Sequence, residues 1–328
     1  MIELRNVTKL YGTVIGVNDI DLTLAPGAYG LLGPNGAGKT TFLNLLTGQL
    51  FPSLGEVRVF GGRPNHPQIL EKVGFCPGFE GMYANVSAYE WVTYLLELQG
   101  YARSQAKERA RDALTLVGLS DAMHRPIGGY SRGMRQRAKF AQATAHDPEL
   151  LILDEPFNGL DPIGRHDITM MLRDWIRRGR SLILSSHILH EVEAITTSFL
   201  LIYGGRLLAS GSAEEVYSLL TDVPSEITLH CSHGALLAQR LIHEELVEGV
   251  TLIGDLGLKL ATRRPLRVYQ RLPQLCQELE ISIEEVHSTD DSLHAVFSTL
   301  LRLRRGDRFS HAASSRMTKA VSGSGEDR

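Results

Sequence analysis

The sequence has little of several features that would assign it to a specialised class of protein. Its 328 residues include only three cysteines, Cys76, Cys231 and Cys276, which lie far apart and form no C-x-x-C pair. Neither a disulfide framework nor a zinc site is therefore indicated, and a reducing compartment is the expected environment. No apolar stretch approaches the ~20 residues that a membrane-spanning helix needs. The first residues, Met1 to Asn6, also lack the basic and then apolar pattern of a signal segment. Any membrane role is expected to come through another chain.

An excess of charge of one sign is missing too. The net charge of −3 argues against a dedicated nucleic-acid binder, which usually has a strong basic excess. A hydrophobic share of 43% and a charged share of 22% are typical of ordinary globular proteins. The chain is longer than the ~250 to 300 residues at which single cores stop growing, which predicts two domains.

A glycine-rich loop is the most informative feature that the sequence does contain. Residues 33–40 read G-P-N-G-A-G-K-T, between an apolar strand expected at Ala28–Leu32 and a helix expected over Thr41–Leu46. The glycines let successive backbone N–H groups point inward, and the helix start adds its positive dipole end to the same cavity. The pattern predicts a polyphosphate site in which Lys39 reaches the β- and γ-phosphates and the Thr40 hydroxyl ligates Mg²⁺.

The pattern of apolar runs predicts an α/β fold for residues 1–220. Short apolar strands alternate there with longer helical segments, which predicts a mostly parallel central sheet. Leu150–Leu153 is a continuous apolar run, and Leu182–Ser185 is apolar up to its final serine. Such runs are typical of strands that are covered on both faces. Strand character is lost over about residues 83–145, so we predict a helical subdomain there. Its expected helices include Glu90–Leu98 and Ala106–Leu114.

A second and smaller domain is expected over residues 221–305. Its element order, strand–helix–strand–strand–helix–strand, predicts a ferredoxin-like α+β sandwich. The tail over residues 306–328 is rich in Ser, Gly and charge, and we expect it to be disordered. The six elements are expected near Glu226–His230, Ala235–Leu246, Val250–Ile253, Gly257–Ala261, Tyr269–Leu279 and Ile281–Val286.

Two carboxylates follow the apolar run at Leu150–Leu153. Asp154 is suited to hold Mg²⁺ through its water shell, and Glu155 to polarise the water that attacks the γ-phosphate. Such a pair also occurs as helix caps or turn residues, but the glycine-rich loop favours the catalytic interpretation. Another expected strand ends at His187, whose imidazole can donate to the γ-phosphate or to the attacking water, although an isolated histidine more often has a packing role.

Together these motifs resemble the ATP-binding subunit of an ABC transporter. Gly33–Thr40 matches the Walker A loop, and Leu150–Glu155 matches Walker B with its catalytic glutamate. Asn158–Asp161 resembles the D-loop, and His187 resembles the switch histidine. The resemblance covers roughly residues 1–220. It implies a P-loop NTPase fold with ATP and Mg²⁺ as ligands.

The resemblance also implies a nucleotide site shared between two subunits. Tyr11 stands where the family places an aromatic residue that stacks on adenine, with a packing role as the alternative. Tyr130–Arg137 occupies the place of the signature segment, which contacts the γ-phosphate bound to the opposite subunit. A serine hydroxyl, a glycine N–H and a helix N-terminus there suit an anion. The residues expected to take part are Glu155 and His187 in catalysis; Tyr11, Asn35, Gly36, Gly38, Lys39, Thr40, Thr41, Ser131, Gly133 and Asp161 in nucleotide binding; and Thr40 and Asp154 in binding Mg²⁺.

Two positions depart from the family pattern. Arg132 stands where the most common signature has glycine, and it can add positive charge near the nucleotide. Gly78 falls where the family places the Q-loop glutamine, which touches Mg²⁺ and couples to the membrane domain. Glu80 is a candidate substitute, although a shift of two positions changes the reach of a side chain by several ångströms.

The sequence, together with the resemblance, predicts an ATPase subunit on the cytoplasmic face of the cell membrane. It is expected to hydrolyse Mg-ATP at a dimer interface and to energise a separately encoded ABC-2-type permease, with export as the expected direction. Its partners would be that integral membrane permease and a second ATPase subunit, identical or similar, with no nucleic acid. Asp290–Leu300 resembles the terminal helix of subunits that serve such exporters, and it also fits an amphipathic helix that covers the small sandwich.

Alternatives of other classes stay open. Gly78 motivates a catalytically degenerate, structural or regulatory subunit of a heterodimeric transporter. A soluble ABC-type ATPase that acts on DNA or ribosomes is disfavoured, because neither a second cassette nor a long coiled-coil insertion is visible. A GTPase is disfavoured because no N-K-x-D run follows the glycine-rich loop.

Overall fold

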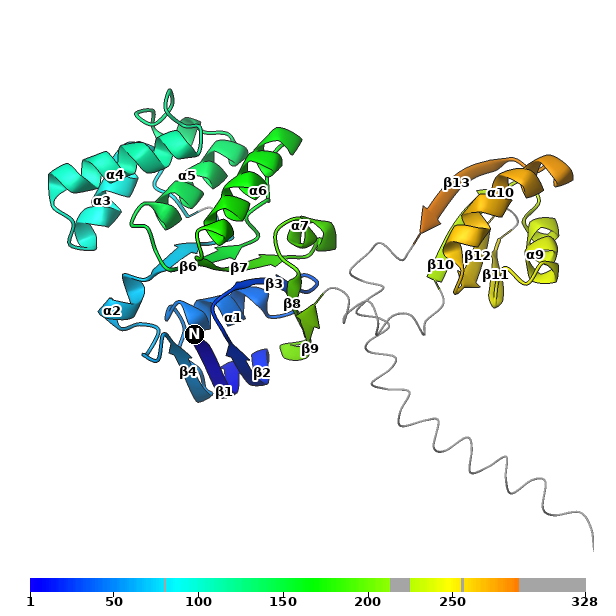
Figure 1. Ribbon diagram of the computed structural model, residues 1–328, viewed down its shortest axis with the longest axis horizontal. Helices are drawn as coiled ribbons and strands as arrows, with labels where there is room; N and C mark the ends of the chain where they lie inside the picture. The colour runs from blue at the N-terminus through cyan, green and yellow to red at the C-terminus, as the bar shows by residue number, and fades with distance from the viewer. Residues whose placement is uncertain (80, 213–224, 255–256, 289–328) are drawn as a thin grey trace, which may run out of the picture. The chain divides into compact units, whose positions relative to one another are not determined.

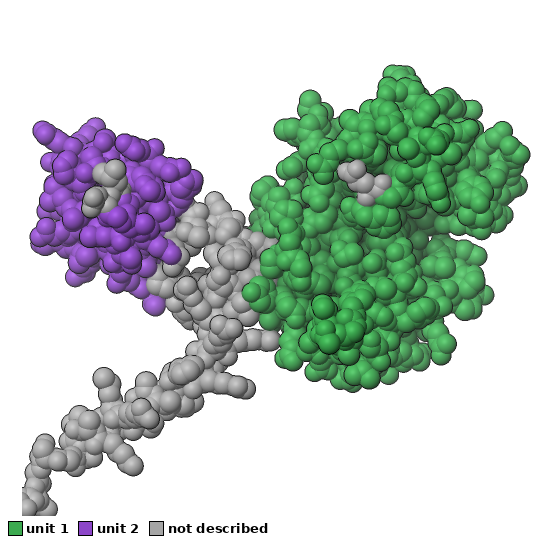
Figure 2. All heavy atoms as spheres, turned by 180° about the vertical axis from the view of Figure 1, so that it is seen from behind, with its two compact units in different colours: residues 1–213 green, residues 214–328 purple. Residues whose placement is uncertain are grey.

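The computed structural model describes residues 1–79, 81–212, 225–254 and 257–288. The chain forms two compact units, Met1–Ala213 and Glu214–Arg328, which Figure 2 shows in different colours. Each unit has a hydrophobic core of its own. The helix expected at Asp290–Leu300 and the side chain of Glu80 lie outside the described residues, so the expectations about them stay predictions.

A six-stranded sheet forms the centre of the first unit (Figure 1). In spatial order its strands are β5 (Val73–Cys76), β6 (Leu150–Asp154), β7 (Ser181–Ser186), β3 (Ala28–Leu32), β8 (Ser198–Tyr203) and β9 (Arg206–Ser212). All neighbours run parallel except β8 and β9, which are antiparallel. Every residue of β6 and β7 is buried, as their apolar runs predicted. Because β3, β6 and β7 are parallel, the residues that follow them meet at one edge of the sheet.

The first strands of the chain form a separate antiparallel sheet that the sequence pattern did not predict. Its strands lie in the order β2 (Val14–Leu24), β1 (Ile2–Tyr11) and β4 (Leu54–Val59). Only two residues connect β1 to β2, and one of them, Gly12, has a φ of +61°. So short a connection can join only antiparallel strands. The expectation that strands and helices alternate from Met1 onward is therefore wrong for this segment.

Helix α1 (Lys39–Leu46) packs in the core that the two sheets share. Phe42 and Leu46 on this helix are 0% exposed, and they belong to the same core as Ile2 of the antiparallel sheet and Ile152 of the parallel sheet. Burying a side chain of this size stabilises the fold by about 1.5–3 kcal/mol. The packing fixes the start of α1 beside the carboxyl end of β3.

The helices expected between β5 and β6 are confirmed as α3 (Ala88–Leu98) and α4 (Arg103–Leu116), and both pack against α5 (Arg132–Thr144). Figure 1 shows these helices gathered on one side of the first unit. A capping box of Ser87 and Glu90 begins α3. Among the described residues no helix is long and apolar enough to cross a bilayer. The other helices of this unit are α2 (Pro67–Leu70), η1 (Ile127–Gly129), α6 (Pro162–Arg177) and α7 (Leu189–Glu193).

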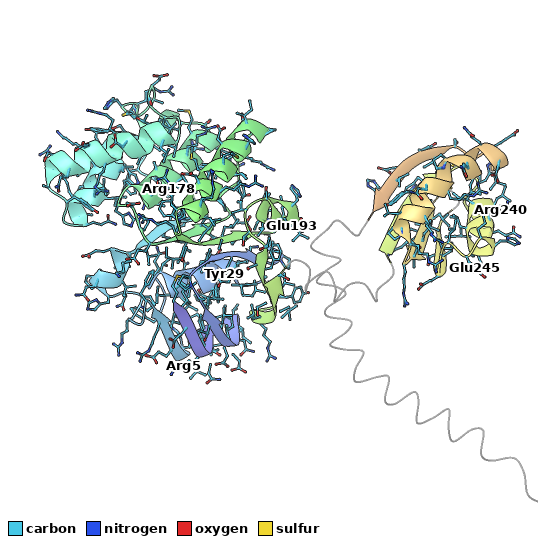
Figure 3. All side chains as sticks on the ribbon, viewed as in Figure 1. Arg5, Tyr29, Arg178, Glu193, Arg240 and Glu245 are labelled. Carbon is cyan, nitrogen blue, oxygen red and sulfur yellow. The ribbon has the colours of Figure 1, made fainter. Side chains whose placement is uncertain are left out.

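The described residues of the second unit form a four-stranded antiparallel sheet with two helices. Its elements, in chain order, are β10 (Ser225–Cys231), α9 (Gly234–His243), β11 (Gly249–Ile253), β12 (Gly257–Thr262), α10 (Pro265–Leu279) and β13 (Ile283–Ser288). The strands lie in the order β11–β12–β10–β13. Leu229, Leu241, Leu260 and Leu275 are 0% exposed and form its core with their neighbours. Figure 3 marks the end of α9 by Arg240 and Glu245. The ferredoxin-like class stays a prediction.

Candidate functional site

The glycine-rich loop predicted at residues 33–40 lies between β3, which Tyr29 marks in Figure 3, and α1. Gly36 and Gly38 have φ angles of +78° and +104°, which L side chains rarely adopt. A Cβ on Gly38 would also collide with the backbone oxygen of Gly16. No side chain caps the first turn of α1. The backbone N–H groups of that turn are therefore available to bind an anion. The loop and the start of α1 thus fit a polyphosphate.

Lys39 lies at the base of this loop. Its side chain is 6% exposed, and its Nζ donates to the backbone oxygen of Gly33 at 2.7 Å. The same Nζ lies 3.1 Å from Oε1 of Glu155. The two groups form an ion pair, but they are not aligned for a hydrogen bond, and the buried Oε1 has no hydrogen-bond partner. A buried cation with one balancing carboxylate, beside an uncapped helix start, suits the phosphates that the sequence predicts here.

Asp154 ends β6 beside the first turn of α1. Its Oδ2 accepts a hydrogen bond from Thr40 Oγ1 at 2.8 Å, and its Oδ1 accepts one from Ser185 Oγ at 2.6 Å. The described residues contain no group of three or more His, Cys, Asp or Glu that could hold a metal by itself. Mg²⁺ is usually held by one or two carboxylates together with substrate phosphates. The adjacent oxygens of Thr40 and Asp154 therefore fit Mg²⁺ that arrives with a nucleotide.

Glu155 is held in an unusual backbone conformation next to Asp154. Its φ is +49°, in the left-handed region, which costs a residue of this kind about 1–3 kcal/mol. Its backbone N–H donates to Ser185 Oγ at 2.9 Å. Its Oε2 lies 3.0 Å from Nδ1 of His187. The carboxylate thus lies between Lys39 and His187, and the strands that precede these residues, β6, β7 and β3, are neighbours in the sheet.

Ser185 also belongs to this site, although no motif in the sequence predicts a role for it. It is 0% exposed and lies opposite Asp154 in the parallel register of β6 and β7. One hydroxyl holds both the Asp154 carboxylate and the Glu155 backbone. The signal that could have indicated it is a serine at the end of a run that is otherwise apolar.

A second network fixes the segment after β7. Ser186 Oγ donates to Glu191 Oε2 at 2.8 Å, and Glu191 Oε1 lies 3.2 Å from Nη1 of Arg165. Arg165 Nε donates to the backbone oxygen of Leu160 at 3.3 Å. The network connects the segment that carries His187 with the segment Asn158–Asp161. Sequence reasoning did not find it, because Arg165 and Glu191 match no motif by themselves.

The signature segment, which is expected to serve a partner's nucleotide, lies next to the segment that resembles the D-loop. Ser131 caps α5, and its Oγ accepts from the N–H of Met134 at 3.2 Å. A Cβ on Gly133 would lie 3.3 Å from the backbone oxygen of Gly159. Asp161 caps α6, and its Oδ1 accepts from the N–H of Gly164 at 2.8 Å. The structure gives Asp161 a helix-capping role, so its contact with a nucleotide stays a prediction.

Tyr11, Asn35 and Thr41 lie around the glycine-rich loop. The Tyr11 hydroxyl is 3.3 Å from Thr41 Oγ1, and the side chain is 45% exposed. Its ring leaves no room for a Cβ on Gly16, so it packs against β2 beside the first turn of α1. Asn35 is exposed in the turn of the loop. Adenine stacking by Tyr11 stays a prediction.

These contacts define a class of protein. A glycine-rich loop between a parallel strand and a helix, with Asp154 and Glu155 at the end of a neighbouring strand, is the arrangement of a P-loop NTPase. The family described as ABC transporter matches residues 17–158. This chain belongs to the family of ABC transporter ATP-binding proteins.

Its relatives carry names of transport and resistance proteins. The bacitracin transport ATP-binding protein BcrA of Enterococcus faecalis is 39% identical over 221 residues, which are 66% of this chain and 71% of the relative. The daunorubicin/doxorubicin resistance ATP-binding protein DrrA of Streptomyces peucetius is 33% identical over 257 residues, 77% of each chain. A solved ATP-binding cassette, described as a dimeric post-hydrolysis state bound to ADP and Pi, is similar in fold with a TM-score of 0.60. It is 21% identical, and the match covers 65% of this chain and 98% of that one.

Replacing Ser185 by alanine is expected to lower the free energy of unfolding by about 1–3 kcal/mol, because Asp154 loses a buried donor. We also expect Mg²⁺-dependent ATP binding to weaken about 10-fold, as for other losses of a group that orients a metal ligand. Ser181→Ala removes a buried hydroxyl from the opposite end of β7 and is the matched control. Calorimetric titration of ATP at several Mg²⁺ concentrations, with thermal melts, checks both effects. Equal Mg²⁺ dependence in the two variants would contradict the role given to Ser185.

Proposed function

We propose that this chain hydrolyses Mg-ATP and thereby energises a separately encoded ABC-2-type membrane permease, in the direction of export. The observation that carries the proposal is the connected set of Lys39, Glu155 and His187, with Thr40 and Asp154 beside it. It joins a phosphate-binding cation, a carboxylate suited to act as a base, and two oxygen ligands for a metal. A subunit that only bound nucleotide would not need Glu155 held in a costly backbone conformation.

The side chains divide the hydrolysis between them. Lys39 and the N–H groups at the start of α1 bind the β- and γ-phosphates, while Tyr11 stacks on the adenine. Thr40 and Asp154 hold Mg²⁺, which when bound neutralises phosphate charge. Glu155 accepts a proton from a water whose oxygen forms a bond to the γ-phosphorus, while the bond from that phosphorus to the bridging oxygen breaks and ADP leaves with the electron pair. His187 orients Glu155 and donates to the γ-phosphate.

The second part of the proposal is a dimer with shared sites. Ser131 and Gly133 would contact the nucleotide bound to the other subunit, identical or similar, and Asp161 would take part in nucleotide binding. A helix that begins at a serine cap presents N–H groups to an anion. The related solved cassette is described as dimeric with ADP and Pi bound.

Transport through a permease is supported by the names of the relatives, which include transport, drug resistance and Nod factor export proteins. We place the subunit on the cytoplasmic face of the cell membrane, where ATP is available. We propose an ATPase domain over residues 1–220 with its helical subdomain at about 83–145. The strand order of the second unit supports a ferredoxin-like domain over 221–305.

One alternative has an observation in its favour. The position where the family has its Q-loop glutamine is Gly78, so no amide reaches Mg²⁺ from there. A degenerate subunit that binds ATP and pairs with a more active partner would fit this substitution.

Purified full-length protein decides between these functions. We expect Mg²⁺-dependent ATP affinity by calorimetry and steady release of phosphate by the protein alone, and we expect detergent-solubilised membranes to yield a permease bound to the tagged chain. ATP affinity without phosphate release, with release restored by a second ATPase subunit, would support the degenerate alternative. No ATP affinity in the presence of Mg²⁺ would contradict both functions.

A further inference from the structure

The loop after β5 lies directly against the metal-binding carboxylate. A Cβ on Gly78 would lie 3.0 Å from Oδ2 of Asp154 and 3.3 Å from its Cγ. Such distances are shorter than those that a Cβ normally makes, so at position 78 the backbone leaves little room for a side chain beside Asp154. Oδ2 is also the atom that accepts the hydrogen bond from Thr40. The position of this loop therefore determines the space available to one of the two predicted Mg²⁺ ligands.

A lysine from α5 holds this loop from its other side. Lys139 Nζ donates to the backbone oxygen of Pro77 at 2.9 Å and to that of Phe79 at 3.2 Å, the two residues that flank Gly78. Lys139 is only 4% exposed. A buried ammonium group is costly unless it is hydrogen-bonded, and these two carbonyl groups accept two of the hydrogen bonds of Lys139.

A second contact, one turn earlier on α5, connects the helix with the end of β5. Gln136 is 5% exposed, and its Nε2 lies 3.8 Å from Sγ of Cys76. Cys76 is 0% exposed. Burial raises the pKa of its thiol to about 12, while the nearby charge of Lys139 acts in the opposite direction. Residues three apart face the same side of a helix, so Gln136 and Lys139 form one continuous attachment between α5 and the segment 76–79.

We propose that Lys139 is a positioning residue that ties α5 to Asp154 by fixing the backbone of residues 77–79. The helix that Lys139 occupies begins at the signature serine, Ser131. Lys139 thus gives the segment expected to serve the partner's nucleotide a direct connection to a metal ligand of its own subunit. The effect on Mg²⁺ rests on the proposed ATPase function, whereas the fixing of the loop does not.

Two substitutions separate these effects. Lys139→Met keeps a long side chain and removes the ammonium group, so residues 77–79 lose their two hydrogen bonds. Gly78→Ala keeps Lys139 and places a methyl group against Asp154. Lys107→Met, on the exposed side of α4, is the matched control for loss of a lysine from the helical subdomain. A glutamine at position 78 begins with the same Cβ as alanine, so Gly78→Gln is expected to impair the Mg²⁺ site and not to improve it.

The first measurement is the rate at which a thiol reagent labels Cys76 in the native full-length protein, followed by mass spectrometry of its peptide. Lys139→Met is expected to raise that rate about 10-fold, because local opening of the loop exposes the thiol. Cys231, which is buried in the second unit, is the internal control and should label at an unchanged rate. An unchanged rate at Cys76, in a variant that keeps its melting temperature, would overturn the proposal whether or not the protein hydrolyses ATP.

The second measurement is the Mg²⁺ concentration that gives half-maximal ATP hydrolysis. Lys139→Met and Gly78→Ala are each expected to raise it about 10-fold, with Lys107→Met unchanged. ATP binding measured without Mg²⁺ should stay within about twofold in all three, because none of them touches the glycine-rich loop. Faster labelling of Cys76 with an unchanged Mg²⁺ requirement would overturn the connection to Asp154. Absence of ATP hydrolysis by the unmodified protein would instead count against the proposed function, and the labelling result would still decide the role of Lys139 in the loop.

Discussion

Replacing Glu155 by glutamine is expected to reduce ATP turnover by about 10²- to 10⁴-fold, the usual contribution of a general base. The amide has nearly the same shape as the carboxylate but cannot accept the proton of the attacking water. ATP binding should persist, since Lys39 keeps its hydrogen bond to the backbone oxygen of Gly33. Removal of the negative charge 3.1 Å from Lys39 also leaves more of the lysine's charge for the phosphates.

The same variant is expected to accumulate as an ATP-bound dimer. If the γ-phosphate joins two subunits and hydrolysis releases them, a protein that binds but does not cleave ATP stays joined. Light scattering with and without Mg-ATP measures the mass, and a phosphate-release assay measures turnover. Glu149→Gln is the matched control, because Glu149 precedes the same strand and its side chain is 56% exposed. Undiminished turnover in Glu155→Gln, or loss of its ATP affinity, would contradict the role assigned to Glu155.

The part of the site that the sequence predicted lies at the ends of parallel strands. Asp154, Glu155 and His187 each follow or end a buried apolar strand, and the rule that parallel strands end at one edge is enough to bring them together. Lys39 and Thr40 follow from the spacing of the glycine-rich loop. These predictions needed only local patterns and one rule of topology.

The missed contacts depend on pairs of residues far apart in the chain. Lys139 meets Pro77 across 62 positions, and nothing in the spacing of either segment indicates that they touch. The role of Ser185 could not be predicted for another reason. The partner of a hydroxyl in a buried strand is known only once the register of β6 and β7 is known. The sequence pattern did not predict the antiparallel sheet, because strands and helices were expected to alternate from Met1 onward. In the structure β1 is followed directly by β2 after a tight turn.

Two independent reasons predict an aspartate at position 161. The D-loop resemblance and the preference for aspartate at a helix start both predict an acid at this position. The hydrogen bond to the N–H of Gly164 confirms the capping role alone. An Asp161→Asn variant would keep the cap, so any loss of turnover in it would come from the missing charge.

The proposed shared-site dimer predicts that two variants that are inactive alone regain ATP turnover when they are mixed. Lys39→Ala removes the phosphate-binding cation and is expected to lower turnover at least 100-fold. Ser131→Asp keeps a side chain that caps α5 equally well but places a negative charge where a phosphate is expected. It should be inactive to a similar degree, whereas Ser131→Asn, a neutral cap, should be impaired much less.

In a mixed dimer both defects fall in the same site. The subunit with Lys39→Ala contributes a defective loop to one site and an intact Ser131 to the other, and the Ser131→Asp subunit does the reverse. One site thus combines both substitutions and the other has neither. An equimolar mixture contains about one half mixed dimers, each with one of two sites intact, so independent sites would recover about one quarter of the original turnover. Two affinity tags isolate the mixed dimer for the phosphate-release assay. If the isolated mixed dimer remains as inactive as its parents, Lys39 and Ser131 act on the same nucleotide within one chain, and the shared-site arrangement is wrong.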